Sequence, residues 1–160
     1  MIRLLIDELL ECAESTGQSV VTAESCSAGL LALAFSRGKG ASKHFMGGFV
    51  TYTKEMKSRV LKVPPQLLHD KTAVCSEVAI AMAKGALILS NASVAVSITG
   101  VAGPENDEDG NPVGLVYCAV ARKDGGEKVI RLQCQPGKPE AVLDEACVEA
   151  LKLLRSFCFS

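Results

Sequence analysis

Helix-like and strand-like patterns alternate along the first 100 residues of the chain, and this alternation restricts the fold more than any other feature. Ile2, Leu5 and Leu9 share one helical face, whereas the β-branched residues that begin at Val20 favour a strand. Helical patterns cover 2–13, 28–35, 54–61, 76–89 and 139–157, and strand patterns begin at Val20 and cover 45–53, 93–99, 115–122 and 128–134. The last two strand patterns surround a DGG turn and favour a hairpin. The sequence therefore predicts an α/β fold, a three-layer α/β/α sandwich with a mixed, mostly parallel sheet.

Length and composition indicate one globular domain over residues 1–160. The chain is 48% apolar and 22% charged, which supplies enough apolar side chains for a core. A net charge of −1 without a basic run, and the lack of tryptophan, argue against nucleic-acid binding. No apolar run reaches the roughly 18 residues of a membrane span, and Asp7 and Glu8 interrupt the apolar start. We therefore expect a cytoplasmic protein that does not bind membranes.

The seven cysteines favour reduced thiols over disulfides or a zinc site. Their number is odd, and no two have the C-x-x-C spacing. The two histidines, His44 and His69, are isolated in probable loop positions and make a poor metal site. We expect no metal.

The first stretch with chemical potential is TAESCSAG, residues 22–29. It follows the valines as a turn from a strand into a helix, so Ser25 stands at the carboxyl edge of the sheet, where α/β folds place ligands. If the helix begins near Ser27, the N–H groups of Ser27, Ala28 and Gly29 are free to bind an anion. The alternative is that Ser25 or Ser27 only caps the helix.

The second stretch is FVTYTKEMK, residues 49–57. A lysine held near a serine in a partly dry pocket loses proton affinity and can act as a general base. The Tyr52 hydroxyl could orient that amine or relay its proton. Alternatively, Lys54 and Lys57 are solvated charges on a short helix.

The third stretch is ITGVAGP, residues 98–104, a buried strand that opens into a glycine-rich turn. Glycines at 100 and 103 let main-chain amides approach a ligand closely, although a plain turn is equally compatible. Gly114 closes the same loop in this interpretation. The acidic run 105–110 resembles the start of a calcium loop, but its twelfth position is Val116 rather than a glutamate. We therefore expect a solvated acidic loop.

Together, TAESCSAG at 22–29, GGFVTYTKEMK at 47–57, SITGVAGP at 97–104 and PVG at 112–114 resemble the C-terminal domain of the CinA family of competence- and damage-inducible proteins. The likeness is to its stand-alone type, nicotinamide-nucleotide amidohydrolase. It implies hydrolysis of nicotinamide mononucleotide to nicotinate mononucleotide and ammonia. It also implies Ser25 as nucleophile, Lys57 as general base and Tyr52 as its partner, because Lys57 lies five residues after Tyr52 whereas Lys54 falls at a variable position.

The same resemblance implies a small-molecule nucleotide as the binding partner and no metal or organic cofactor. Apolar helix surface is compatible with a homodimer or a higher homo-oligomer. Substrate binding is assigned to residues of the first and third stretches, namely Glu24, Ser27, Ala28, Gly29, Thr99, Gly100 and Gly103.

Departures from the family pattern keep other functions open. Ser27-Ala28 replaces the usual Thr-Gly, Cys75-Ser76 stands where Ser-Glu is common, and the last helix offers Lys138 and Leu143 in place of arginines near its start. The alternative function is a catalytically weak nucleotide-binding or regulatory module of the competence or DNA-damage response. A third hypothesis makes Cys26 the nucleophile, because a helix N-terminus acidifies a thiol.

Overall fold

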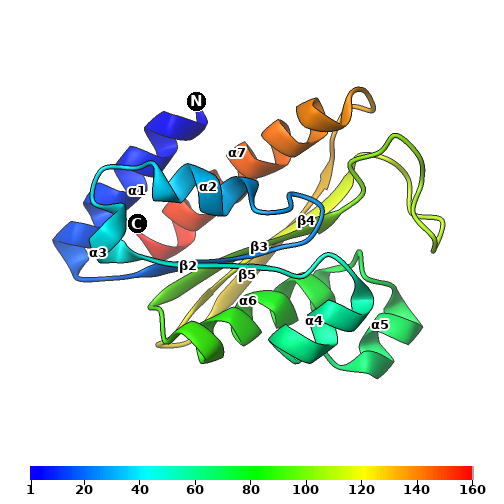
Figure 1. Ribbon diagram of the computed structural model, residues 1–160, viewed down its shortest axis with the longest axis horizontal. Coiled ribbons are helices and arrows are strands. Elements are labelled where there is room, and N and C mark those ends of the chain that lie inside the picture. The colour runs from blue at the N-terminus through cyan, green and yellow to red at the C-terminus, as the bar shows by residue number, and fades with distance from the viewer. Residues whose placement is uncertain (160) are drawn as a thin grey trace.

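A five-stranded mixed sheet forms the middle layer of the computed structural model, which describes residues 1–159 (Figure 1). The strand order is β2-β1-β3-β4-β5. β1 (Val20–Glu24) is an interior strand and runs parallel to both of its neighbours, β2 (Phe45–Val50) and β3 (Val94–Gly100). β4 (Leu115–Arg122) and β5 (Glu127–Gln133) continue the sheet as the expected antiparallel hairpin. The mixed sheet of the sequence-based prediction is confirmed.

Helices cover both faces of the sheet, so the predicted three-layer sandwich is also confirmed (Figure 1). One layer contains α1 (Ile2–Thr16), α2 (Leu30–Ser36), α3 (Ala41–His44) and α7 (Pro139–Cys158), and the other contains α4 (Lys54–Leu61), α5 (Pro65–Lys71) and α6 (Ser76–Ser90). No helix within residues 1–159 combines the length and the apolar character needed to cross a bilayer.

Alternate residues of the central strands enter two separate cores. Val20 and Val94 point into the core beneath α1, α2 and α7, whereas Val21 and Ala95 point into the core beneath α4, α5 and α6. All five residues of β1 are buried. A strand that is buried on both faces is therefore fixed in the middle layer, and the residue that follows its carboxyl end is placed to reach a ligand.

The strand β2 has a bulge just before its glycine pair, Gly47-Gly48, and a close approach to neighbouring side chains at Gly48. The pairing of β1 with β2 shifts register between Val20 and Val21, which gives β2 one extra residue. A Cβ on Gly48 would lie 2.8 Å from the Ala32 Cβ and closer still to the Thr22 Oγ1. Only glycine lets α2 pack this tightly on β2.

Four local predictions are wrong. His44 and His69 were expected in loops, but they lie in the helices α3 and α5. α2 begins at Leu30 rather than at residue 28, because Ala28 and Gly29 both have left-handed backbone conformations. β2 ends at Val50, so residues 51–53 lie outside the strand. The helix α5 was not expected, because Pro64 and Pro65 were interpreted only as a stop signal, whereas Pro65 is the first residue of α5.

Candidate active site

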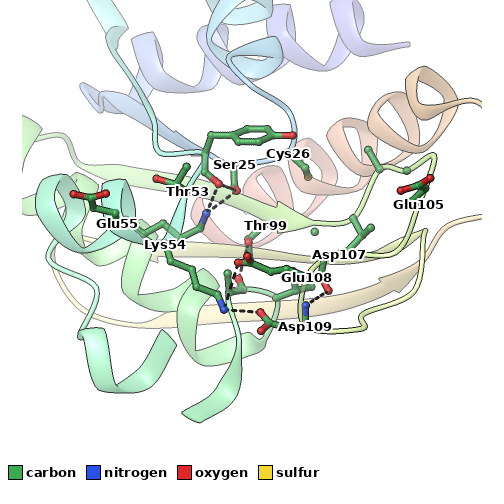
Figure 2. A pocket seen from close by; sticks show the side chains of 18 residues that line it. Ser25, Cys26, Thr53, Lys54, Glu55, Thr99, Glu105, Asp107, Glu108 and Asp109 are labelled. Atoms are coloured by element: carbon green, nitrogen blue, oxygen red, sulfur yellow. Dashed lines mark hydrogen bonds and ion pairs between the residues drawn. The ribbon is translucent and has the colours of Figure 1, made fainter. Parts of the chain in front are cut away.

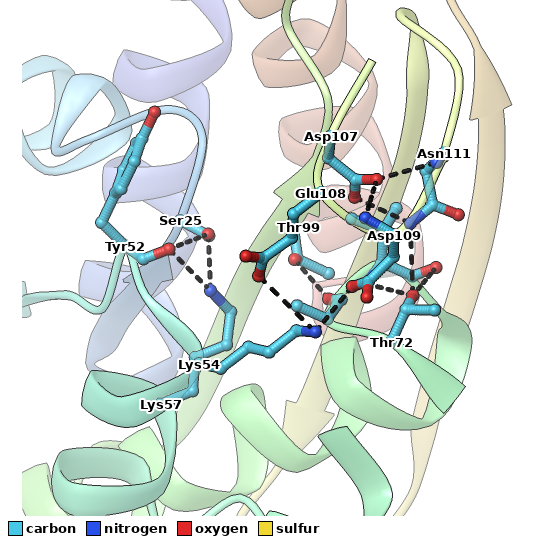
Figure 3. A network of polar contacts seen from close by, with 12 residues as sticks. Ser25, Tyr52, Lys54, Lys57, Thr72, Thr99, Asp107, Glu108, Asp109 and Asn111 are labelled. Atoms are coloured by element: carbon cyan, nitrogen blue, oxygen red, sulfur yellow. Dashed lines mark hydrogen bonds and ion pairs between the residues drawn. The ribbon is translucent and has the colours of Figure 1, made fainter. Parts of the chain in front are cut away.

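Ser25 and Lys57 contact each other beyond the carboxyl end of β1, although 32 residues separate them (Figure 3). The Lys57 Nζ lies 2.7 Å from the Ser25 Oγ, and the two residues are only 1% and 6% exposed. Ser25 is anchored by its amide, which donates to the Ile98 carbonyl of β3 at 3.0 Å. Lys57 is the fourth residue of α4, which the Thr53 side chain caps by accepting from the Met56 amide.

Two main-chain carbonyls orient the Lys57 amine. Its Nζ donates to the Thr51 carbonyl at 2.8 Å and to the Tyr52 carbonyl at 3.2 Å, in addition to the Ser25 Oγ. An ammonium has three N–H bonds, and these three acceptors match them. After loss of one proton, the carbonyls retain two N–H bonds and the lone pair faces the Ser25 Oγ. The amine is thus positioned to take the proton of the serine hydroxyl.

Burial lowers the pKa of Lys57 from its ordinary 10.5 to about 8, and the positive charge of Lys54 acts in the same direction. At such a pKa, roughly one amine in ten is uncharged at pH 7. The expectation that both lysines are solvated is therefore wrong for Lys57, which is buried. Lys54 keeps its charge, because the hydrogen bond to Asp109 raises its pKa.

A buried carboxylate occupies the N-terminus of α2. The fully buried Glu24 accepts from the amides of Gly29, Leu31 and Ala32 at 3.1, 3.1 and 2.8 Å. The Ser27 hydroxyl donates to the same carboxylate at 2.7 Å. The charge that the helix N-terminus attracts is therefore supplied by the protein itself. This cap also fixes the turn that carries Ser25.

The expected row of free amides at residues 27–29 is wrong for two of the three. The Gly29 amide is bound to Glu24, and the Ala28 amide donates to the Ser25 carbonyl at 3.0 Å. Ala28 adopts φ +49°, a left-handed conformation that glycine accommodates with less strain, and this is the position where the family pattern has glycine. The main-chain geometry of the family turn is thus kept here with an alanine.

A cavity of about 570 Å³ opens over the Ser25–Lys57 pair (Figure 2). This volume is within the usual range of about 300–1,000 Å³ for small-molecule sites. Three of the residues predicted to bind substrate line it, namely Thr99, Gly100 and Gly103. The four others (Glu24, Ser27, Ala28 and Gly29) are not among its lining residues, and neither are Lys138 and Leu143 of the last helix region.

The glycine-rich turn after β3 lines the cavity and contains two main-chain amides without a partner in the part of the chain that the structure describes. Within residues 1–159, the amides of Ala102 and Gly103 donate to no carbonyl or side chain of the protein. Gly114 donates its amide to the Val101 carbonyl at 2.8 Å and so closes the loop, as the sequence predicts. Thr99 is buried at the end of β3, and its hydroxyl donates to the Ala73 carbonyl at 2.7 Å, which joins β3 to the segment between α5 and α6.

The Tyr52 side chain does not make the contact expected of it. Its main-chain carbonyl accepts from both Lys57 and Ser25, but the residue is 67% exposed. Within residues 1–159, its phenol hydroxyl forms no hydrogen bond with either of them, and the ring points away from the amine (Figure 3). The peptide group of Tyr52 therefore orients the pair, and Tyr52 is one of the residues that line the cavity.

Cys26 lines the cavity next to Ser25, but its thiol is not acidified. Burial raises the pKa of the Cys26 thiol to about 12. The premise that it begins a helix also fails, because α2 starts only at Leu30. The structure therefore gives no support for a Cys26 thiolate nucleophile. Among the described residues 1–159, no three His, Cys, Asp or Glu side chains are grouped so as to hold a metal ion.

The acidic loop between β3 and β4 is part of the cavity wall, which the sequence analysis did not predict. Lys54 pairs with Asp109 at 2.7 Å and with Glu108 at 3.5 Å, and so joins α4 to this loop across the cavity (Figures 2 and 3). The Asp107 carboxylate accepts from the Asn111 amide at 2.7 Å and keeps the loop folded on itself. No local sequence pattern connects Lys54 with this loop, so the sequence carried no signal for this contact.

The chain matches one family model over nearly its whole length, that of the CinA C-terminal domain, over residues 3–158. It is 39% identical to a CinA-like protein of Geobacter sp. (strain M21) over 151 residues, which are 94% of this chain and 36% of that protein. A CinA-like protein of Geobacter sulfurreducens is 40% identical over 87% of this chain and 33% of its own length. The chain thus spans about a third of the length of these curated relatives.

Solved structures of similar proteins have the same fold. The competence/damage inducible protein CihA from Agrobacterium tumefaciens matches with a TM-score of 0.93 and 34% identity, covering 97% of this chain and 94% of that one. A CinA superfamily protein from Escherichia coli matches with a TM-score of 0.92 and 36% identity, covering 96% of this chain and 88% of that one.

Proposed function

The chain belongs to the CinA family through the C-terminal domain, and from this membership we propose that it is an amidohydrolase that converts nicotinamide mononucleotide to nicotinate mononucleotide and ammonia. One observation carries the proposal: the Lys57 Nζ is 2.7 Å from the Ser25 Oγ, in a buried position that opens on a cavity of about 570 Å³. A hydroxyl paired with an amine of lowered pKa is a nucleophile with its general base.

In the proposed mechanism, uncharged Lys57 accepts the proton of Ser25 while the Ser25 Oγ attacks the carboxamide carbon. The tetrahedral intermediate then collapses, and the Lys57 ammonium gives its proton to the departing nitrogen, which leaves as ammonia. Water, deprotonated by the same amine, attacks the acyl-serine ester. This second step releases nicotinate mononucleotide and returns the proton to Ser25.

The negative oxygen of the tetrahedral intermediate needs donors that are already in place. The unpartnered amides of Ala102 and Gly103 on the cavity wall are candidates for this oxygen or for the phosphate of the nucleotide. The N-terminus of α2 is not a candidate, because Glu24 already occupies it.

For Tyr52, the proposal is that its carbonyl orients Lys57 and its ring covers the bound substrate. Tyr52→Phe, which removes only the hydroxyl, should keep kcat within about threefold of the wild type, since a lost proton relay would cost on the order of 100-fold or more. Tyr52→Ala should raise KM by removing the ring. A loss of kcat in Tyr52→Phe comparable to that in Lys57→Ala would restore the phenol to a role in proton transfer.

Ammonia release from nicotinamide mononucleotide by the purified chain tests the function. Ser25→Ala and Lys57→Ala should each lower turnover by at least about a thousandfold while the circular dichroism spectrum stays unchanged. The matched control is Lys62→Ala, an exposed lysine that follows α4 and whose ammonium donates to the Arg59 carbonyl at 2.9 Å. Full activity in either site variant would overturn the mechanism. Tight binding of the nucleotide without ammonia release would favour the binding or regulatory module instead.

A further inference from the structure

Lys54 is the one ammonium group on the cavity wall that is not engaged with Ser25. Among the lining residues, only Lys54 and Lys57 are basic, and Lys57 is buried against the serine. The Lys54 side chain is 32% exposed and reaches across the cavity to Asp109 and Glu108 (Figure 3). A cation at the mouth of this cavity is thus already paired with carboxylates of the protein.

The rest of the wall is unfavourable to an anion. Five carboxylates line the cavity: Glu55, Glu105, Asp107, Glu108 and Asp109. Like charges repel, so an anionic group on a ligand avoids these side chains, whereas a cationic group such as a pyridinium ring is attracted to them. A ligand that carries both charges is therefore favoured in the orientation that places its anionic group at Lys54 and its cationic group near the carboxylates.

We propose that Lys54 binds the phosphate of the substrate, and that Asp109 and Glu108 hold this position in the free protein until the phosphate displaces them. This inference rests on the proposed function, because it takes a phosphorylated amide as the substrate. It makes Lys54 a residue that determines specificity, selecting nucleotides over nucleosides that carry the same carboxamide.

The contacts of Lys54 can be exchanged without unfolding the loop. Exposed and half-exposed ion pairs are weak, and the Glu108 side chain is 76% exposed. The loop is held by other bonds, namely those of Asp107 to the Asn111 side chain at 2.7 Å and of Asn111 to the Thr72 hydroxyl at 3.3 Å. A doubly charged phosphate competes well for one ammonium against two carboxylates of which one is largely solvated.

The test compares nicotinamide mononucleotide with nicotinamide riboside, which lacks the phosphate. The measured quantity is the ratio of kcat/KM for the nucleotide to kcat/KM for the riboside. Lys54→Met should lower this ratio at least about tenfold, and Lys54→Arg should restore most of it. Asp109→Asn should raise the ratio by about threefold to fivefold, because the phosphate then meets less competition. The control Lys84→Met breaks a 3.0 Å pair with Glu127 away from the cavity and should leave the ratio unchanged.

The ratio separates phosphate binding from other roles of Lys54. If Lys54 only fixes the loop, or only lowers the pKa of Lys57, Lys54→Met slows both substrates equally and the ratio stays constant. Either this result or a lower ratio in Asp109→Asn overturns the inference, while ammonia release by the wild type still supports the proposed function.

A second measurement decides the inference if the wild type releases ammonia from neither compound. The probe is inorganic phosphate, compared with chloride at equal ionic strength, and the readout is the midpoint of thermal unfolding. Phosphate should raise the midpoint of the wild type and of Lys84→Met, raise that of Asp109→Asn further, and leave that of Lys54→Met unchanged. An equal rise in Lys54→Met would place the phosphate elsewhere and overturn the inference. The absence of ammonia release by the wild type would overturn the proposed function independently of this phosphate measurement.

Discussion

Burial of Lys57 has opposite consequences for reactivity and for stability. The side chain is 1% exposed, and its pKa falls to about 8 because an ammonium is poorly solvated there. The lowered pKa supplies an uncharged base near neutral pH. The same burial lowers the free energy of unfolding at every pH at which Lys57 stays protonated in the folded protein.

The pH dependence of the reaction should follow this pKa. Because only uncharged Lys57 can accept the Ser25 proton, kcat/KM should rise nearly tenfold per pH unit below about pH 8 and level off above it. Ammonia release measured from pH 6 to pH 10 checks this profile. A flat profile over that range would show that Lys57 is not the titrating base.

The pH dependence of stability should differ between the wild type and Lys57→Met. The folded pKa is lowered, so the unfolded chain binds more protons between about pH 8 and pH 10.5, and wild-type stability rises with pH in that window. Methionine cannot titrate. The stability of Lys57→Met relative to the wild type should therefore fall by about 3 kcal/mol between pH 7 and pH 11.

Urea denaturation followed by circular dichroism at both pH values measures this difference. The other titrating groups are common to both proteins and cancel in the comparison. A relative stability that does not change with pH would mean that Lys57 has an ordinary pKa in the folded protein. The activity of the variant should be absent at every pH, because no base remains beside Ser25.

At the scale of single elements, the turn between β1 and α2 depends on a residue of the strand. Glu24 ends β1 and caps α2 by accepting from two amides of this helix and from the amide of Gly29, the residue before it. The hydroxyl of Ser25, the next residue, therefore has its direction set by a carboxylate that never reaches the cavity. This explains why the turn retains its shape although Ala28 is in a left-handed conformation.

Glu24→Gln should destabilise the protein and reduce catalysis together. Glutamine keeps the size, but its NH₂ group is a donor facing other donors, so we expect a loss of about 2–4 kcal/mol in the free energy of unfolding. Turnover should fall because Ser25 loses its fixed position. The matched control is Glu14→Gln, an exposed residue of α1 whose pair with Lys43 is 3.9 Å long, which should change stability by less than about 0.5 kcal/mol. Urea unfolding and ammonia release of both variants test this. If Glu24→Gln is as stable and as active as Glu14→Gln, Glu24 does not have the role assigned to it.

At the scale of the whole molecule, the sheet brings together three segments that are far apart in sequence. Ser25 follows β1, Lys57 comes from α4 after β2, and the turn with Gly103 follows β3. These three strands are adjacent and parallel, so their carboxyl ends meet at one edge. The candidate site lies at that edge, with one wall supplied by the loop that leads to the hairpin.

Nucleotide binding should therefore stabilise the entire fold. In Ser25→Ala, which cannot consume the ligand, nicotinamide mononucleotide at 100 times its dissociation constant should raise the free energy of unfolding by about 2.7 kcal/mol. Thermal unfolding with increasing nucleotide measures this shift. No shift at millimolar nucleotide would argue against this substrate, whereas a shift without wild-type turnover would favour a binding module.

The sequence by itself determined the class of fold and the identity of the short motifs. Helical spacing and β-branched runs depend on neighbours in the chain, so they located β3, the β4–β5 hairpin, α4, α6 and α7 to within a residue or two, together with the start of β1. The short helix α5 and the delayed start of α2 were missed, because left-handed residues and a proline at a helix start leave weak local signals. The resemblance to the family supplied Ser25 and Lys57 as a pair.

Only the tertiary structure decided which atoms meet. Side-chain direction at the end of a strand depends on register, on the neighbouring strands and on packing from both layers, and none of these is encoded locally. The 2.7 Å contact of Lys57 with Ser25, the capture of the α2 amides by Glu24 and the outward ring of Tyr52 are all of this kind. The reach of Lys54 to Asp109 joins residues that no local pattern connects, because it depends on where a loop returns to the sheet.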